Sequence, residues 1–511
     1  MVATVMTGST IGIEGYLIEV EVDITSSLPG IIIVGLPDAA VSEAKERVKS
    51  AIKNSGFAFP NKKIIINMAP ADIKKEGSAF DLPLAIGVLA ASEYISIDNS
   101  KNICLLGELS LDGSLRSVNG VLPVVLAAKE KGLTKVIVAE ENGKEAALIE
   151  GIEIYAVKTL AEAIDALRED TPIKPVTLNK AKILKDQQKN ISLPDFSEVK
   201  GQEHVKRALE IAATGGHNVL MAGAPGAGKS MLAKAFAAIL PPLEYSEAIE
   251  VSKIYSVSGQ LLHGKGLISS RPFRSPHHTA SSIGIIGGGN IPKPGEISLA
   301  HRGVLFLDEA VEFPRNVLEV LRQTLEDKVV TISRAQLSVT YPADIILMLA
   351  MNPCPCGHKG DAIKNCVCSN SQVQKYWSKL SGPLLDRIDI QIEVTRLDEK
   401  EILGHTPTGE NSETIRNRVI NARKIQIERF KNHGIVSNSQ MNSKLIKKYC
   451  QLDNDSEALL LTAIKQMQLS ARAYDKTLRL ARSIADLSGD TNIQINHIAE
   501  ALQYRNINKF T

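Results

Sequence analysis

The spacing of apolar and polar residues in the first third of the chain predicts strands that alternate with helices. From position 18 to 24, isoleucine and valine alternate with glutamate and aspartate, which is typical of a half-buried strand. Short apolar runs predict further strands at 31–34, 64–66 and 136–138. Apolar residues at helical spacing predict two helices ended by glycines, over 41–52 before Gly56 and over 121–131 before Gly132. Residues 1–170 are therefore expected to form an α/β domain.

The pattern changes near position 171 and again near 396. Residues 171–195 are rich in Lys, Gln and Asn and show no sustained periodicity, so we interpret them as an interdomain linker. A second α/β domain is expected over 196–396, with strands at three apolar runs: 218–221, 304–307 and 345–350. Residues 397–511 show helical periodicity and few strand signals, which predicts a helical C-terminal domain.

Composition narrows the class of protein. The chain has 511 residues, of which 44% are hydrophobic, as expected of a folded protein with about three domains. Its 59 basic and 57 acidic residues leave a net charge of +2, so any contact with nucleic acid must come from a local basic patch. No apolar run is long enough to span a bilayer and the N-terminus lacks signal-peptide features, so a cytoplasmic location is expected. Because thiols stay reduced there, the six cysteines are expected to be ligands or core residues rather than disulfides.

A glycine-rich segment between a predicted strand and a predicted helix has the clearest chemistry. Its residues follow the phosphate-loop pattern G-x4-G-K-[ST]: Gly223, Ala224, Pro225, Gly226, Ala227, Gly228, Lys229 and Ser230. The glycines allow turns whose N–H groups point at phosphates, and the helix N-terminus favours negative charge. We expect Lys229 to reach the β- and γ-phosphates of ATP and Ser230 to bind Mg²⁺. The alternative is an ordinary glycine-rich turn.

Two further strand ends have polar side chains. The apolar run at 304–307 ends in Asp308 and Glu309, which we assign to the magnesium shell and to the catalytic base, respectively. The alternative is a surface acidic pair. The run at 345–350 leads to Asn352, whose amide is placed to position the attacking water. Arg387 is a candidate arginine finger, and the alternative for it is a salt bridge to Asp386 or Asp389.

A cluster of cysteines suggests a metal site. Cys354-x-Cys356 and Cys366-x-Cys368 are separated by nine residues, and four thiolates can hold Zn²⁺ as a tetrahedral structural site. The spacing within each pair is shorter than usual, and His358 is a substitute ligand. The alternative is a group of reduced thiols. The neighbouring histidines His277 and His278 are expected to diverge from an extended segment, so we assign them a structural or DNA-contacting role rather than a metal pair.

Several longer strings add specificity: RPFRSPHHT at 271–279, GGG at 287–289, PGEISLAH at 294–301, NPCPCG at 352–357 and LSGPLLDR at 380–387. With the phosphate loop, they resemble the AAA+ ATPases, in particular the ComM/YifB family of the magnesium-chelatase-like group. The resemblance implies an AAA+ P-loop α/β core with a C-terminal helical lid, and ATP and Mg²⁺ as cofactors. It also implies that Asn352 is the sensor-1 residue, Arg387 the finger and Arg472 a sensor-2 arginine, in a hexameric ring with ATP sites between subunits.

The same resemblance implies a DNA substrate. Residues 330–335 fit a hairpin that faces the pore in this group, and Arg334 lies near its tip, so a ring of arginines would meet the DNA backbone. The alternative is that Arg334 is a solvent-exposed turn residue. The implied function is an ATP-driven helicase that promotes branch migration of single-stranded or branched DNA in natural transformation, with recombination proteins as partners. A second hypothesis is a protein-remodelling or chelatase-type chaperone.

Residues 1–170 resemble the proteolytic domain of Lon, which has a ribosomal S5 domain 2-like fold. The matching strings are KKEGSA at 74–79, GELSLDG at 107–113 and the run from 118 to 138. Lon-type proteases use a Ser–Lys dyad, but alignment puts Ala79 at the serine and Leu122 at the lysine. The domain is therefore expected to be proteolytically inactive. A shift of one residue would make Ser78 the nucleophile, which is the basis of a third hypothesis, an active protease.

Overall fold

The computed structural model describes residues 2–75, 77–96, 102–168, 171–179, 193–261, 266–289, 291–334, 338–361, 364–397, 409–467 and 470–505. Most of the expected linker, Glu76 of the Lon-like string and Ala335 of the expected hairpin lie outside these residues. The chain divides into two compact units. The first unit contains Met1–Lys189, Glu244–Ser269 and Ser333–Tyr341, and the second contains Asn190–Leu243, Ser270–Ile332 and Pro342–Thr511. The domain limits expected from the sequence stay predictions.

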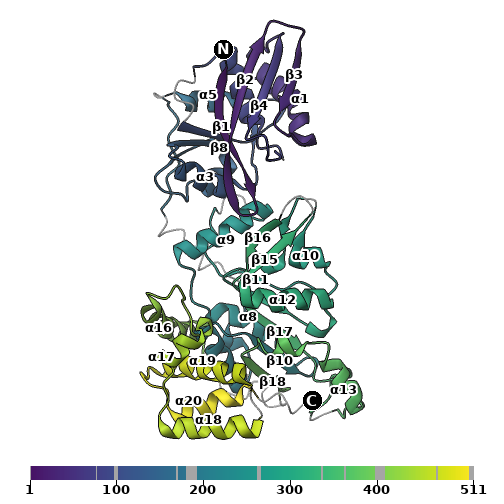
Figure 1. The fold of residues 1–511 in the computed structure, drawn as a ribbon, viewed down its shortest axis with the longest axis vertical. Helices are drawn as coiled ribbons and strands as arrows, with labels where there is room; N and C mark the ends of the chain where they lie inside the picture. Colours follow the sequence, from purple (N-terminus) through teal and green to yellow (C-terminus); the bar gives the residue numbers. More distant parts are fainter. Residues whose placement is uncertain are drawn as a thin grey trace. The chain divides into compact units, whose positions relative to one another are not determined.

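The first unit is built on a seven-stranded sheet in the order β3-β4-β2-β1-β5-β8-β9 (Figure 1). Its strands are β1 Ala3–Ile11, β2 Glu14–Thr25, β3 Gly30–Val34, β4 Lys63–Ala69, β5 Ile103–Leu106, β8 Lys135–Ala139 and β9 Glu153–Val157. The pairs β1–β2 and β2–β4 are antiparallel, and the other pairs are parallel. Two short strands, β6 (Glu108–Leu109) and β7 (Leu115–Arg116), pair separately.

Helices pack on both faces of this sheet. They are α1 Ala39–Asn54, α2 Asp81–Ala91, α3 Val121–Glu130, α4 Gly143–Ala146 and α5 Leu160–Leu167. A Cβ added to Gly87 of α2 would lie 2.7 Å from Val22 Cγ2, so α2 covers the face to which Val22 points. Gly8 points to the opposite face, where an added Cβ would lie 2.4 Å from Val124 Cγ1. Glycine at position 8 therefore allows α3 to approach the sheet closely.

The second unit is built on a parallel five-stranded sheet in the order β11-β14-β17-β10-β18. Its strands are β10 Val219–Gly223, β11 Phe273–Arg274, β14 Val304–Leu307, β17 Ile346–Met351 and β18 Ile390–Val394. Strands β10 and β14 are buried along their whole length, because helices cover both faces of a parallel sheet. Among these helices are α7 Glu203–Gly215, α8 Lys229–Ile239 and α12 Arg315–Asp327. The predicted α/β core is confirmed.

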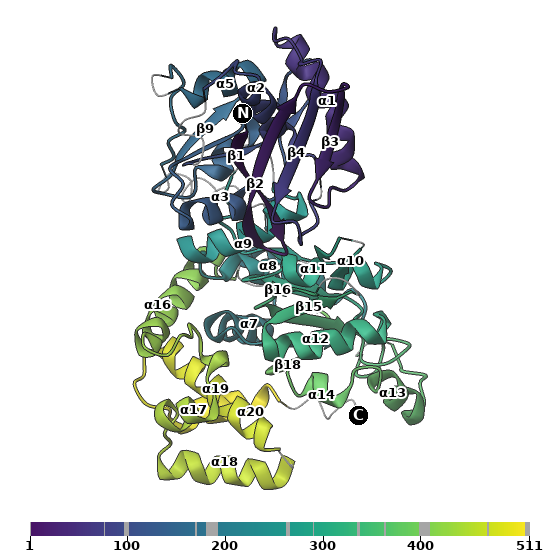
Figure 2. The same ribbon diagram turned by 45° about the horizontal axis from the view of Figure 1, so that its top comes forward.

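The end of the chain is helical, as predicted. Its helices are α16 Ser412–Phe430, α17 Ser443–Tyr449, α18 Asn454–Met467, α19 Ala471–Ser488 and α20 Ile495–Gln503, which gather in the yellow part of Figures 1 and 2. A buried ion pair between Arg429 and Asp486 joins α16 to α19 at 2.5 Å. Smaller elements of the second unit are α10 Ser282–Ile286, β12 Gly287–Gly288, β13 Lys293–Pro294, α11 Glu296–Leu299, α13 Asn370–Trp377 and α14 Gly382–Leu385. Within the described residues, no helix is long and apolar enough to cross a membrane.

Helix α9 (Tyr245–Ser258) lies between α8 and β11 in the sequence but belongs to the first unit. It packs against α3. Its Ser256 hydroxyl donates to Glu145 Oε1 at 2.5 Å, and Lys253 Nζ lies 3.1 Å from Glu14 Oε1. The expected hairpin is formed by β15 (Val329–Ser333) and β16 (Ser338–Pro342).

Candidate nucleotide-binding site

The phosphate loop joins the end of β10 to the start of α8, as the sequence predicts. Gly226 and Gly228 have φ angles of +79° and +87°, and a Cβ at either would meet nothing within 4 Å. Glycine is therefore needed there for the backbone conformation rather than for space. The loop ends at the N-terminus of α8, where free N–H groups and the helix dipole favour a phosphate group.

Lys229 connects the loop to Asn352. Its Nζ atom donates to the carbonyl groups of Gly223 and Ala224, the latter at 3.1 Å, and to Asn352 Oδ1 at 3.2 Å. Burial lowers the pKa of Lys229, while Asp308 and Glu309 act to raise it. The structure thus brings together the lysine, both carboxylates and the amide that sequence reasoning placed on three separate segments.

The Ser230 hydroxyl and the Asp308 carboxylate form a pair of oxygen donors. Ser230 Oγ donates to Asp308 Oδ2 at 2.6 Å, and Asp308 Oδ1 accepts from the Glu309 N–H at 3.0 Å. A hydroxyl beside a carboxylate suits Mg²⁺, which binds oxygen ligands and retains several waters. The donor set therefore fits the expected Mg²⁺–ATP, with Lys229 for the phosphates.

Glu309 is held in an uncommon conformation. Its φ angle is +51°, which non-glycine residues rarely adopt and which concentrates at functional sites. Its side chain is exposed, and Oε2 lies 3.3 Å from His278 Nδ1. The expectation that His277 and His278 diverge is wrong, because their rings lie 4.2 Å apart and are tilted by 32°. The spacing of residues in the sequence did not predict the contact between His278 and Glu309. The sequence signal for this segment was the RPFRSPHHT string, which indicated the family but not the contact.

Arg387 and Arg472 lie together in a pocket of about 320 Å³ in the second unit. Lys476 and Arg479 also line it, and among its described lining residues there is none from the phosphate loop. Arg387 pairs with Glu326 and donates to the Pro383 carbonyl at 2.8 Å. Burial lowers the pKa of Arg387, and the positive charge of Arg472 adds to this effect. The salt bridge of Arg387 is therefore to Glu326 rather than to Asp386 or Asp389.

Asp389 holds the segment that carries Arg387. The side chain of Asp389 is 8% exposed, and its carboxylate lies 3.1 Å from Lys476 Nζ on α19 and 3.5 Å from His217 Nδ1. The same carboxylate accepts from the Asn218 N–H at 3.2 Å, and the Asn218 side chain donates to the Arg387 carbonyl at 3.0 Å. Burial acts to raise the pKa of Asp389. The positive charge of Lys476 and the contact with His217 outweigh burial and hold this pKa well below its usual range. Sequence reasoning did not find this role.

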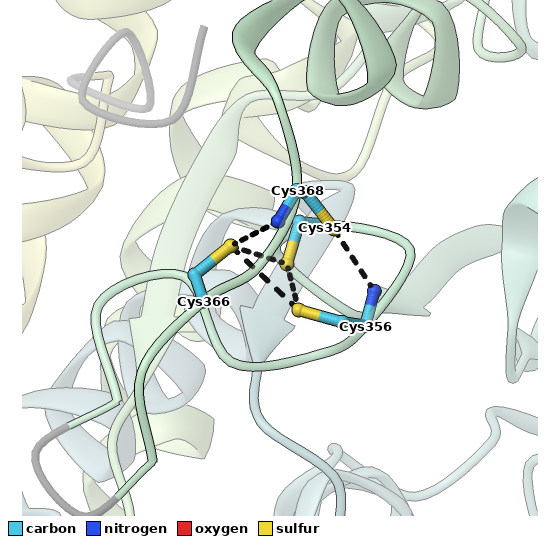
Figure 3. Close-up of side chains that lie close together, drawn as sticks. All are labelled: Cys354, Cys356, Cys366 and Cys368. Carbon is cyan, nitrogen blue, oxygen red and sulfur yellow. Dashed lines mark hydrogen bonds between the residues drawn. The ribbon is translucent and has the colours of Figure 1, made fainter.

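The four clustered cysteines form a group of converging thiols, which Figure 3 shows. Their Sγ atoms all lie within 4.8 Å of one another. Cys354 Sγ is 3.3 Å from Cys356 Sγ, and Cys366 Sγ is 3.6 Å from both. Backbone N–H groups also point at sulfur, from Cys356 to Cys368 at 3.4 Å and from Cys368 to Cys366 at 3.5 Å.

The thiols differ in acidity, and His358 is engaged elsewhere. Backbone N–H groups of Val367 and His358 lower the pKa of Cys356 to about 6. The ring of His358 contacts Asp361 at 2.9 Å, so the geometry gives a set of four sulfurs without it.

The remaining candidate residues lie in the first unit. Arg334 follows β15 directly and is exposed. The Ser78 hydroxyl donates to Glu108, whereas Leu122 is buried and its N–H donates to Glu145. The loss of proteolytic activity stays a prediction.

Comparisons with known proteins match three segments of the chain to magnesium chelatase families. Residues 195–402 match "Magnesium chelatase, subunit ChlI", 20–142 match "Subunit ChlI of Mg-chelatase", and 409–505 match "Magnesium chelatase, subunit ChlI C-terminal". The chain is 42% identical to "Competence protein ComM" of Haemophilus influenzae over 506 residues, which cover 98% of this chain and 97% of that protein.

Two further relatives extend the comparison. The chain is 41% identical to YifB of Escherichia coli, over 99% of this chain and 97% of that protein. It is 33% identical to Lon protease 2 of Bacillus subtilis over 177 residues, which cover 31% of each chain. The chain therefore belongs to the ComM/YifB family of magnesium-chelatase-like AAA+ proteins and has an N-terminal region similar to Lon.

Proposed function

We propose that the protein is an ATP-driven DNA motor that assembles as a hexameric ring and promotes branch migration in natural transformation and homologous recombination. The observation that carries the proposal is that the residues expected to act on ATP lie in two separate places. Lys229, Ser230, Asp308, Glu309 and Asn352 gather at the phosphate loop, whereas Arg387 lines a separate pocket with Arg472. A ring in which each pocket faces the neighbour's phosphate loop would complete every site.

Within such a site, Lys229 would bind the β- and γ-phosphates, and Ser230 with Asp308 would hold Mg²⁺. The metal would supply charge neutralisation at the phosphates. Glu309 would accept a proton from the attacking water, and His278 would orient that carboxylate. Asn352 would fix the position of the water, while the neighbour's Arg387 and Arg472 would stabilise charge on the transferred phosphoryl group. A structural Zn²⁺ at the four cysteines belongs to the same proposal.

The proposed DNA contact is local. Because the net charge is only +2, an exposed arginine at a hairpin supports contact with the phosphate backbone better than any general basic field. Arg334 is such a residue. The name of the relative ComM, a competence protein, supports incoming DNA as the substrate, and a motor on such DNA would work in the cytoplasm with recombination proteins.

The test is a branch-migration assay on a three-strand junction with wild type, Lys229→Ala and Arg334→Ala. Wild type should hydrolyse ATP faster with DNA and should move the junction. Lys229→Ala should lose both activities and retain DNA binding, because the lysine contacts phosphates of ATP only. Arg334→Ala should keep basal ATP hydrolysis but lose DNA stimulation and movement. A ring that hydrolyses ATP and never moves a junction would overturn the proposal.

The matches to three magnesium chelatase segments favour a second candidate, a chelatase-type or protein-remodelling chaperone. Its ATP hydrolysis would respond to a protein partner and not to DNA. Hydrolysis measured with and without single-stranded DNA, at low and high salt, separates the two candidates, since DNA stimulation through phosphate contacts falls steeply with salt.

A further inference from the structure

The cysteine cluster lies in a loop that begins directly after Asn352 and leads into α13, which returns to the same part of the chain. Cys354 follows Asn352 by two residues, and Ser369, directly after Cys368, caps α13 through a bond from the Gln372 N–H at 3.3 Å. Helix α13 then runs back, so that Trp377 Nε1 donates to the Pro353 carbonyl at 3.0 Å. A backbone hydrogen bond also joins Asn352 to the side chain of Tyr376. Asn352 thus lies directly before the cysteine loop and also contacts the helix that follows this loop.

The same loop touches the phosphate loop. A Cβ added to Gly357 would lie 2.8 Å from Cδ and 2.9 Å from Cγ of Pro225, so the two loops are in close contact. The Asn352 side chain itself lies 3.2 Å from Lys229 Nζ. A change in the conformation of the cysteine loop would therefore move an amide that contacts the catalytic lysine.

The sulfur geometry suits one metal ion. Tetrahedral Zn–S bonds of about 2.3 Å place sulfurs about 3.8 Å apart. The Sγ atoms of Cys354, Cys356 and Cys366 lie 3.3 to 3.6 Å apart, and all four sulfurs, including that of Cys368, lie within 4.8 Å of one another. The two N–H groups that point at sulfur are the kind of outer contacts that orient thiolate ligands. Helix α13 links the cysteine loop to Pro353, because Ser369 caps its start and Trp377 at its end donates to the Pro353 carbonyl.

We propose that the four thiolates bind Zn²⁺ and that this ion sets the rate of ATP hydrolysis by positioning Asn352. On binding, the four thiols release their protons to solvent and form four zinc–thiolate bonds, with no change in oxidation state. The proposal rests on the ATPase activity of the proposed function but not on its DNA substrate. In the proposed function Asn352 contacts the attacking water, whereas the cysteines act through Asn352 and are positioning residues.

The first experiment compares Cys368→Ser with Cys450→Ala, a matched control because Cys450 is a buried free cysteine outside the cluster. Metal content is measured by mass spectrometry on protein made in zinc-containing medium. Wild type and Cys450→Ala should carry zinc in a one-to-one ratio, and Cys368→Ser should lose it. In Cys368→Ser, kcat should fall about ten- to a hundredfold, because a misplaced catalytic group costs that much. The Kd for a fluorescent ATP analogue should stay within about threefold of wild type, well under the 1.4 kcal/mol that a tenfold change represents.

Further variants separate positioning from general damage. Cys368→His, which supplies an imidazole ligand, should restore both zinc and kcat. In Asn352→Ala, the added Cys368→Ser change should lower kcat little further, because both substitutions act on one contact. Should Cys368→Ser fail to fold, zinc is stripped from wild type with a chelator and added back, with circular dichroism as a check of folding.

Three results would overturn the inference: wild type without bound metal, unchanged kcat after zinc removal, or equal losses of ATP binding and kcat. A protein whose zinc-dependent ATPase never moves DNA would contradict the proposed function and leave this inference standing.

Discussion

At the scale of single residues, Glu309 combines three properties of a catalytic base. It follows a buried strand, its backbone lies at a φ of +51°, and its exposed carboxylate faces His278. The backbone conformation turns the side chain out of the sheet edge, where a water molecule can reach it.

We expect Glu309→Gln to lower kcat for ATP hydrolysis by about 10²- to 10⁴-fold, the usual value of a general base, with ATP affinity unchanged. The control is Glu312→Gln, since Glu312 lies on the same segment and pairs with Lys379 at 3.1 Å. Steady-state hydrolysis and nucleotide binding would be measured for both. A loss in Glu312→Gln as large as that in Glu309→Gln would exclude the assignment.

Sequence reasoning could place site residues that lie at strand ends, because the edge of a parallel sheet fixes where such residues meet. Asp308 and Asn352 were predicted this way, and Lys229 from the phosphate-loop pattern, and the structure brings the three together. It could not pair His278 with Glu309 or Glu326 with Arg387, because those partners come from segments with no fixed spacing. Such contacts depend on tertiary packing, which periodicity does not encode.

At the scale of elements, Asp389 joins three parts of the second unit. It directly precedes β18, pairs with Lys476 of α19 and accepts from the backbone before β10. Arg387 lies two residues before Asp389, and Arg472 lies on α19 with Lys476. The buried ion pair between Asp389 and Lys476 therefore fixes the distance between the segment of Arg387 and this helix. The helix and the loop are therefore expected to move as one body.

Asp389→Asn should destabilise the protein by about 3–5 kcal/mol, because it leaves Lys476 buried without its counter-ion. The folded-state pKa of Asp389 is depressed, so its stabilisation is present at neutral pH and is lost as pH falls below the ordinary aspartate range. Denaturant unfolding at pH 7 and at about pH 2 measures both effects, with the exposed Asp386→Asn as control. Equal stability of the two variants at pH 7 would contradict this account.

Most elements were predictable because their patterns are local. The buried strands β10, β14 and β17 and the helices α1 and α3 follow from periodicity and terminal glycines. Sequence reasoning missed β1, whose first six residues mix apolar and small polar side chains. Sequence reasoning also predicted no helix over Tyr245–Ser258, where α9 forms as part of the first unit.

At the scale of the whole molecule, the separation of Arg387 from the phosphate loop predicts that two inactive variants can complement each other. Arg387→Ala alone should lower kcat by at least about a thousandfold, and Lys229→Ala should abolish hydrolysis. In mixed rings, about a quarter of the interfaces would pair an intact loop with an intact finger, given head-to-tail contacts. ATP hydrolysis should therefore reappear on mixing.

The control mixture combines Lys229→Ala with Glu309→Gln, whose lesions lie in the same half of the site. No recovery is expected there. Recovery in both mixtures, or in neither, would rule out a site shared between subunits. Hydrolysis is measured after subunit exchange, at a fixed total protein concentration.

The assignment of α9 to the first unit limits how this chain can be divided. A truncated protein that starts at residue 193 would keep the whole phosphate loop and α9 but would remove α3 and Glu145, against which α9 packs. Helix α9 would lose these contacts, and the apolar surface that becomes exposed would be expected to promote aggregation. The Lon-like region therefore cannot be removed alone, since its compact unit includes a helix encoded more than a hundred residues after α3. Exchanging it between relatives would require exchanging α9 as well.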